Sequence, residues 1–134
     1  MQSRCYRWLS LLLLLTSCSV TLEEANRAYE LYRFDKAASM YEELYDQDRD
    51  KVEKAAIAFK AAESYRQKND WSKAEAWYNR AIRRNYSDPE VYFLKARVQN
   101  LQQDFDKSKE TYQKFKKKAP GKKKKADEGI KQVE

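Results

Sequence analysis

The chain has 134 residues, of which 37% are charged, and it contains only two Gly and two Pro. So few helix breakers favour long helices joined by tight turns, and ten Tyr with three Trp argue against a disordered chain. There is no His, and the two Cys, Cys5 and Cys18, both lie near the N-terminus, so neither a zinc site nor a disulfide framework is expected. The net charge of +7 is concentrated in residues 114–125, which hold eight Lys and no acid.

The first seventeen residues have the order of a bacterial secretion signal. Arg4 and Arg7 form a positive start, and the apolar run 8–15 is too short to span a bilayer as a helix, which takes about 20 residues. Residues 15–18, Leu-Thr-Ser-Cys, resemble the lipobox of bacterial lipoproteins. The resemblance implies that 1–17 is a lipoprotein signal peptide, and that lipid on Cys18 anchors the mature chain through a short linker, 18–20. The alternative is an ordinary signal peptide with a chance Cys.

Helix start signals recur along the rest of the chain. They are the capping-box spacings Thr21–Glu24 and Ser72–Glu75, the pair Asp50–Glu53, and an Asp88 N-cap before Pro89. Pro120 and Gly121 end the last strongly patterned segment. The sequence predicts helices near residues 22–32, 35–46, 51–68, 72–84, 89–102, 105–118 and 122–134.

One pattern recurs three times: an aromatic residue, a small residue three positions later, and a Tyr four positions after that. The three copies are Phe34-Ala37-Tyr41, Trp71-Ala74-Tyr78 and Phe105-Ser108-Tyr112. The copies begin 37 and then 34 residues apart, and 34 is the period of a tetratricopeptide repeat. Each copy opens the second helix of a hairpin, where a small residue lets two helices approach closely and the aromatic residue fills the space between them.

The repeats resemble the tetratricopeptide family over about residues 21–120. The resemblance implies an all-α fold in which three helix-turn-helix repeats stack as a short right-handed α-solenoid. Residues 121–134 are expected to form a Lys-rich linker and the start of a further helix. The alternative is a generic helical bundle. The turn position where the family often has Gly holds Tyr32, Asn69 and Gln103 in the three repeats.

In this family the first helix of each hairpin lines a concave groove that binds a partner protein. Carried over position by position, the groove residues are Asn26, Tyr29, Phe59, Glu63, Arg66, Phe93, Arg97 and Asn100. The alternative for Phe59 and Phe93 is packing against neighbouring helices. The chaperone-binding branch of the family holds a peptide carboxylate with Lys and Asn at set positions. Asn26 alone matches that set, with Lys60 near another of its places, so chaperone binding is not inferred.

The Lys run forms a candidate basic patch. It consists of Lys116, Lys117, Lys118, Lys122, Lys123, Lys124 and Lys125. A solvated helix end is the favoured interpretation, because Lys suits the negative end of the helix dipole. The alternative is contact with anionic lipid or another polyanion of the envelope. Nucleic acid is disfavoured by the secretion signal.

Several short motifs give a closer resemblance. They are Ser-Cys-Ser at 17–19, Phe-Asp-Lys-Ala-Ala at 34–38, Tyr112 with Phe115, and Ala126 with Gly129 and Ile130. They resemble the N-terminal repeat region of Bacteroidetes lipoproteins of the OmpA-like and PorE-like group, which is associated with the type IX secretion system and gliding motility.

The sequence therefore predicts an interaction scaffold anchored by lipid to the outer membrane, facing the periplasm and binding an envelope protein. The alternative is the N-terminal spacer or docking fragment of a larger, peptidoglycan-associated lipoprotein. An enzyme is not expected, because the chain has no His, no Gly-rich phosphate loop and no recognisable catalytic acid pair. No cofactor, metal or small-molecule substrate is expected either.

Overall fold

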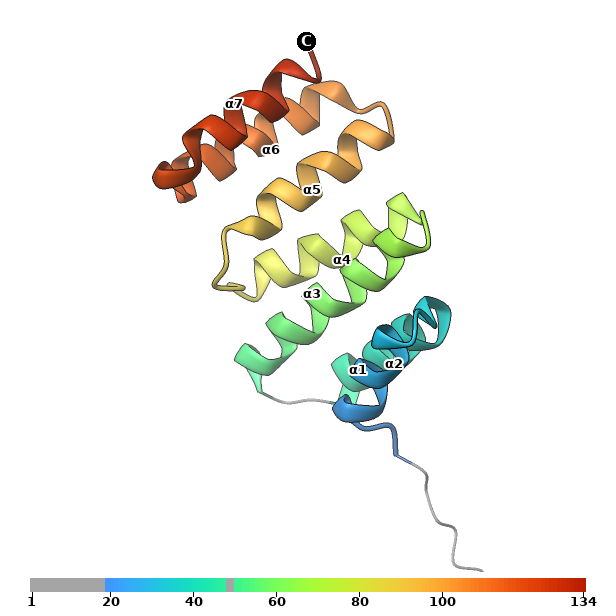
Figure 1. The fold of residues 1–134 in the computed structure, drawn as a ribbon. Coiled ribbons are helices and arrows are strands. Elements are labelled where there is room, and N and C mark those ends of the chain that lie inside the picture. Colours follow the sequence, from blue (N-terminus) through green and yellow to red (C-terminus); the bar gives the residue numbers. More distant parts are fainter. Residues whose placement is uncertain (1–18, 48–49) are drawn as a thin grey trace, which may run out of the picture.

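A computed structural model describes residues 19–47 and 50–134. Over these residues the chain forms helices and no strand (Figure 1). The helices are α1 (Leu22–Glu30), α2 (Phe34–Gln47), α3 (Lys51–Gln67), α4 (Trp71–Arg83), α5 (Glu90–Leu101), α6 (Phe105–Lys118), the short 3-10 helix η1 (Pro120–Lys122) and α7 (Lys123–Lys131). The helices predicted from the sequence are confirmed, with ends that differ by a few residues. The predicted signal peptide and Cys18 lie outside the described residues.

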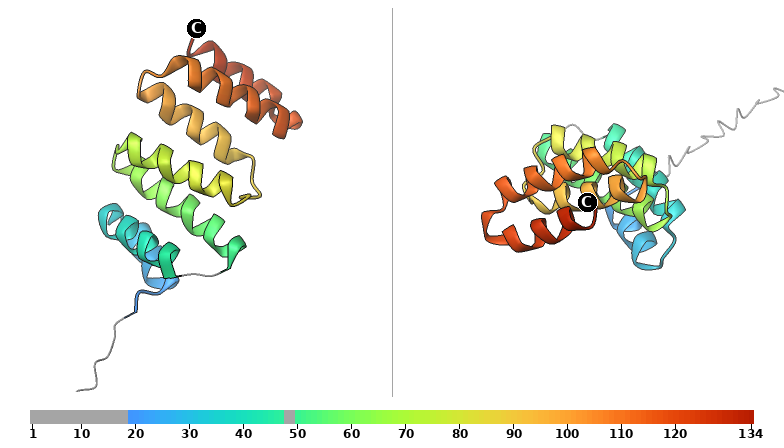
Figure 2. Two further views of the ribbon diagram at one scale, coloured as in Figure 1. Left: turned by 180° about the vertical axis from the view of Figure 1, so that it is seen from behind. Right: turned by 90° about the horizontal axis from the view of Figure 1, so that it is seen from above.

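The helices pack in chain order. α1 pairs with α2, α3 with α4 and α5 with α6, and the contacts continue from α2 to α3, from α4 to α5 and from α6 to α7. Views from opposite sides show one elongated stack, with α1 at one end and the C-terminus at the other (Figures 1 and 2). This arrangement confirms the predicted all-α architecture of stacked hairpins.

The repeated pattern of small and aromatic residues forms the core. Tyr41, Tyr78 and Tyr112 are at most 2% exposed, and the small residue four positions before each of them is fully buried. First helices contribute mainly Ala to the same core, because Ala lets helices approach closely. The aromatic residues that open the second helices are less covered, and Phe105 is 47% exposed.

The helix starts confirm some of the predicted caps and correct others. Thr21 and Glu24 form the predicted capping box, and Asp50 accepts a hydrogen bond from the Glu53 N–H. The box predicted at Ser72 is wrong, because α4 begins one residue earlier and Asp70 is its N-cap, accepting from the Lys73 N–H at 3.1 Å.

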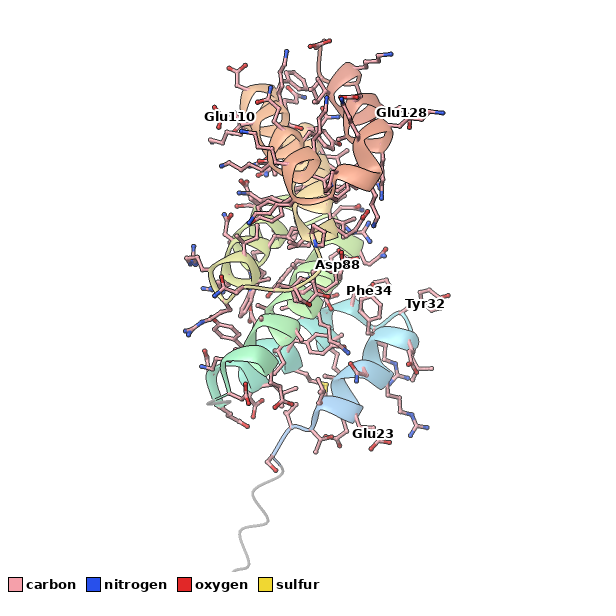
Figure 3. The ribbon with its side chains drawn as sticks, turned by 90° about the vertical axis from the view of Figure 1, so that its left-hand side faces the viewer. Glu23, Tyr32, Phe34, Asp88, Glu110 and Glu128 are labelled. Carbon is pink, nitrogen blue, oxygen red and sulfur yellow. The ribbon has the colours of Figure 1, made fainter. Side chains whose placement is uncertain are left out.

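Four of the described helices, α1, α3, α4 and α5, end in left-handed turns without glycine. Tyr32, Asn69, Asn85 and Gln103 all have φ near +60°, a conformation that Gly adopts most easily. In each turn the next N–H reaches back to the carbonyl five residues earlier, as from Asp104 to Gln99 at 2.9 Å, so the final carbonyls are satisfied. At the first turn Tyr32 lies beside Phe34, with ring centroids 5.9 Å apart (Figure 3).

Residues 121–134 are largely helical. η1 turns the chain directly into α7, so the Lys run lies on helices and the turn between them. Ala126 and Gly129 are buried against the stack, whereas Glu128 projects outward (Figure 3). α7 thus covers one side of the third hairpin and carries charged residues on its exposed face. None of the described helices is both long and apolar enough to cross a membrane.

Candidate partner-binding groove

A cavity of about 400 Å³ lies where the first two hairpins meet. Its lining residues are Asn26, Tyr29 and Glu30 from α1, Tyr41 from α2, and Phe59, Lys60 and Glu63 from α3. Four of the eight predicted groove residues, Asn26, Tyr29, Phe59 and Glu63, therefore come together in one cavity. Tyr41, Glu30 and Lys60 were not among those eight. We call this cavity the α1–α3 pocket.

The polar part of the α1–α3 pocket centres on Asn26. Its side-chain oxygen accepts hydrogen bonds from the Tyr41 hydroxyl at 2.8 Å and from the Lys60 ammonium at 2.6 Å. Burial lowers the pKa of Lys60, and the nearby charge of Glu30 opposes this shift. Because Lys60 pairs with no carboxylate among the residues described, its two other ammonium protons are available to an acceptor that enters the pocket.

The walls of the α1–α3 pocket are aromatic. The Phe59 ring stacks on Tyr86, with centroids 4.5 Å apart and an interplanar angle of 9°. Tyr29 meets Phe34 edge to face, with centroids 5.2 Å apart. Phe59 thus has the packing role considered as the alternative from the sequence, and it also presents a surface to the pocket. Both rings are fixed by neighbours, so they can contact a ligand at little cost in side-chain entropy.

Glu63 and Arg66 are bound to each other rather than free for a partner. Two guanidinium nitrogens of Arg66 donate to the Glu63 carboxylate at 3.1 and 2.7 Å. The buried Tyr78 hydroxyl donates to the same carboxylate. The hydrogen bond to Glu63 raises the pKa of Arg66, and burial raises that of Tyr78. The spacing of three residues between Glu63 and Arg66 is a signal that the sequence offered for their ion pair. The Tyr78 contact could not be read from the sequence, because Tyr78 belongs to α4 and reaches α3 only after the helices pack.

The remaining predicted groove residues lie further along the stack. Phe93 and Arg97 line a second hollow of about 290 Å³ between α5 and α7, together with Lys125. The Lys125 ammonium lies 4.0 Å from the Phe93 ring centroid, and Arg97 is exposed. Asn100 is half-buried on α5. Six of the eight residues are therefore split between two hollows, and Arg66 and Asn100 line neither of them.

The predicted basic patch divides into paired and unpaired lysines. Lys116 binds Asp127 at 2.5 Å, Lys122 binds Glu90 at 3.0 Å, and Lys125 binds the same Glu90 carboxylate. Over the described part of the chain, no carboxylate partner is found for Lys117, Lys118, Lys123 or Lys124. Tertiary structure thus neutralises part of the run that the sequence treats as uniform.

Comparison with known proteins identifies the repeat family. Residues 28–98 match one family profile described as tetratricopeptide repeat, and residues 90–122 match a second. No curated protein sequence matches the chain. The described residues contain no cluster of acidic or Cys side chains that could hold a metal ion.

Two solved structures are similar in fold. The TPR2B domain of yeast Sti1, in a complex with pHsp70, superposes with a TM-score of 0.71 at 16% identity, covering 83% of this chain and 90% of that chain. The first repeat domain of Spaghetti (RPAP3), bound to the HSP90 peptide SRMEEVD, gives a TM-score of 0.69 at 19% identity and covers 83% and 87%. At these identities the likeness concerns the fold.

Proposed function

The chain belongs to the tetratricopeptide repeat family, and from this premise we propose that it is an interaction scaffold that holds an extended segment of a partner protein in the α1–α3 pocket. The observation that carries the proposal is the pairing of an unneutralised ammonium, Lys60, with the fixed aromatic walls Tyr29 and Phe59 in one cavity. Small apolar cavities with a few convergent polar groups are the usual form of a ligand site.

The chemistry of the α1–α3 pocket defines the segment that it accepts. An apolar side chain fits between Tyr29 and Phe59, and a carboxylate or backbone carbonyl beside it accepts from Lys60. Glu30 at the rim disfavours a second acidic group and favours a basic or neutral neighbour. Both structural neighbours were solved in complexes, one with pHsp70 and one with an HSP90 peptide, and this supports peptide binding as the use of the fold.

The setting proposed for this scaffold is the bacterial outer membrane. The support is the sequence alone: the positive start, the short apolar run and Cys18 after Leu-Thr-Ser. A lipid on Cys18 would confine the groove to the membrane plane and raise its effective concentration toward envelope partners. A secretion or gliding-motility complex is the proposed assembly. A spacer role within a larger peptidoglycan-associated lipoprotein is the second candidate, favoured by the motifs around Tyr112 and Gly129.

Crosslinking in the envelope tests the pocket. Native protein is compared with Lys60→Gln and Glu30→Gln, which change opposite charges in the α1–α3 pocket. Lys36→Gln, an exposed residue of α2 outside that pocket, is the control. We expect one partner to be lost with Lys60→Gln and retained with the control, and a peptide from the crosslinked segment to bind Lys60→Gln roughly tenfold more weakly. Equal recovery of all partners with every variant would reject the α1–α3 pocket as the site.

Mass spectrometry of the N-terminus tests the anchor separately. We expect the mature chain to begin at Cys18 with an acyl mass added, and Cys18→Ser to release the protein from the membrane fraction. An unmodified chain would refute the anchor and leave the α1–α3 pocket untouched as a binding site.

A further inference from the structure

Four cations from three helices lie close together along α4, α5 and α6. Lys95 of α5 has the charges of Arg83 and Lys114 beside it, and Lys118 lies one turn after Lys114 on α6. We call Arg83, Lys95, Lys114 and Lys118 the basic surface. None of them forms an ion pair with any residue that the structure describes, and none lines the α1–α3 pocket. All but Lys95 are exposed.

Lys95 shows that this surface is assembled by tertiary packing and not only by the Lys run. It occupies the position in α5 that corresponds to the buried Ala61 in α3, and it is half-buried there. A Lys at such a position can cover its aliphatic stem and keep its ammonium in water. Burial lowers the pKa of Lys95, Glu75 opposes the shift, and the nearby charges of Lys114 and Arg83 lower it further. Residues from α4, α5 and α6 therefore share one positive field.

Three acids in the second half of the stack have hydrogen-bond or ion-pair partners. Glu90 forms ion pairs with Lys122 and Lys125, and Asp127 forms an ion pair with Lys116. Glu75 accepts side-chain amide hydrogen bonds from Gln99 at 2.7 Å and from Gln102 at 2.9 Å. Glu75 keeps its negative charge beside Lys95, and Glu110 lies one turn before Lys114 on α6 without a partner among the described residues. Four cations near these two carboxylates still leave an excess of positive charge for an external anion.

Lys118 also reaches a shallow hollow of about 230 Å³ between the α4–α5 loop and the end of α6. Asn85, Ser87 and Tyr86 line the same hollow. An amide, two hydroxyls and an ammonium are hydrogen-bond donors suited to phosphate oxygens. The basic surface thus combines diffuse charge with one place where a phosphate group can sit.

The composition of the basic surface distinguishes between kinds of anionic partner. Protein interfaces are depleted in Lys and are centred on buried aromatic or aliphatic anchors. The large hydrophobic residues that are exposed in the described chain are Leu31, Tyr32, Leu101 and Phe105, and none belongs to the basic surface. Lysines without an apolar anchor are typical of binding to anionic lipid headgroups, where each contributes about 1 kcal/mol.

We propose that the basic surface binds the phosphate headgroups of an anionic phospholipid membrane. It lies on α4, α5 and α6, away from the end of the stack that α1 forms (Figure 1). A membrane contact there, added to a lipid anchor before residue 19, holds the stack along the membrane instead of letting it swing from one end. The inference stands without the anchor, because the charges alone provide the contact.

Vesicle sedimentation of residues 19–134, which contain every described helix and all the packing contacts between them, tests the proposal. The probes are vesicles of phosphatidylcholine alone and with about 30% phosphatidylglycerol. We expect binding only to the anionic vesicles, falling steeply as salt is raised. The variant Arg83→Gln/Lys114→Gln/Lys118→Gln should bind them on the order of 100-fold more weakly.

Two further variants make the result specific. Arg27→Gln/Arg33→Gln/Lys36→Gln removes the same number of charges from the first hairpin and should retain binding within about threefold. Lys114→Arg/Lys118→Arg keeps the charge and should also retain binding, which separates loss of charge from loss of fold. Equal weakening by both Gln triples, or equal binding to neutral vesicles, overturns the proposal. Binding to duplex DNA or an acidic polypeptide through the same residues, without binding to vesicles, also overturns it.

Discussion

Gly129 in α7 lies directly against the ring of Tyr112 in α6. A Cβ atom at Gly129 would come within 2.5 Å of Tyr112 Cε1, closer than real Cβ contacts allow. Tyr112 is itself almost fully buried, so its ring has little room to move. The close approach of α7 to the last hairpin therefore depends on the absence of a side chain at this position.

Gly129→Ala is expected to destabilise the protein despite the better helix propensity of Ala. Overpacking of this kind lowers the free energy of unfolding by about 1–3 kcal/mol. Gly121→Ala is the matched control, because a Cβ added there would meet no atom within 4 Å, and it should change the free energy by less than about 0.5 kcal/mol. Urea unfolding of both variants measures the difference, and equal stabilities would contradict the packing argument.

Gln103→Gly is expected to stabilise the protein. Gln103 ends the α5 turn with φ 64°, where a residue with a Cβ is strained by about 1–2 kcal/mol. Glycine relieves this strain but gains freedom in the unfolded chain, which leaves a net rise of about 0.5–1 kcal/mol in the free energy of unfolding. Gln103→Ala keeps the strain and should show no rise when the two are compared by thermal unfolding. A Gly variant no more stable than the Ala variant would mean that the turn is relaxed.

Arg66→Met is expected to destabilise the fold even though Arg66 was predicted as a partner contact. The substitution leaves the Glu63 carboxylate, whose side chain is only 15% exposed, without its cation. An unpaired, partly buried charge lowers the free energy of unfolding by about 1–3 kcal/mol. The double variant Glu63→Gln/Arg66→Met should recover part of the loss, and a double-mutant cycle by urea unfolding measures the coupling. Strictly additive effects would show that the pair contributes nothing.

Stability is expected to fall in alkali partly because of Tyr41. Burial raises the pKa of Tyr41 to about 12, so the folded state holds this proton more tightly than the unfolded state does. The resulting stabilisation is fully present below about pH 10 and is lost as pH rises toward 12. Tyr41→Phe should reduce the slope of unfolding free energy against pH in this window by at most about 1.4 kcal/mol per pH unit. An unchanged slope would mean that groups other than Tyr41 cause the loss of stability in this pH window.

The hairpins and their order follow from local patterns in the sequence. Helix formation depends on the 3.6-residue period and on local start signals, and the aromatic–small–Tyr pattern places buried residues such as Ala37 and Tyr41 on one face. These relations act within a few residues, so they can be read without the fold. The reason for the one wrong capping box is also local. Asp70 caps the helix, so α4 begins at Trp71 and Ser72 lies inside it.

Which side chains are free depends mainly on packing between helices. The Arg66–Glu63 pair is local, with a spacing of three residues on α3. By contrast, Tyr78 reaches the same carboxylate from α4, and Lys60 contacts Asn26 of α1 while keeping protons to donate. Likewise, Lys122 forms an ion pair with Glu90. Lys118 has no carboxylate partner among the described residues and lies beside the loop between α4 and α5. A side chain's partner depends on which distant residues the packing brings within about 3 Å, and no local pattern encodes that distance.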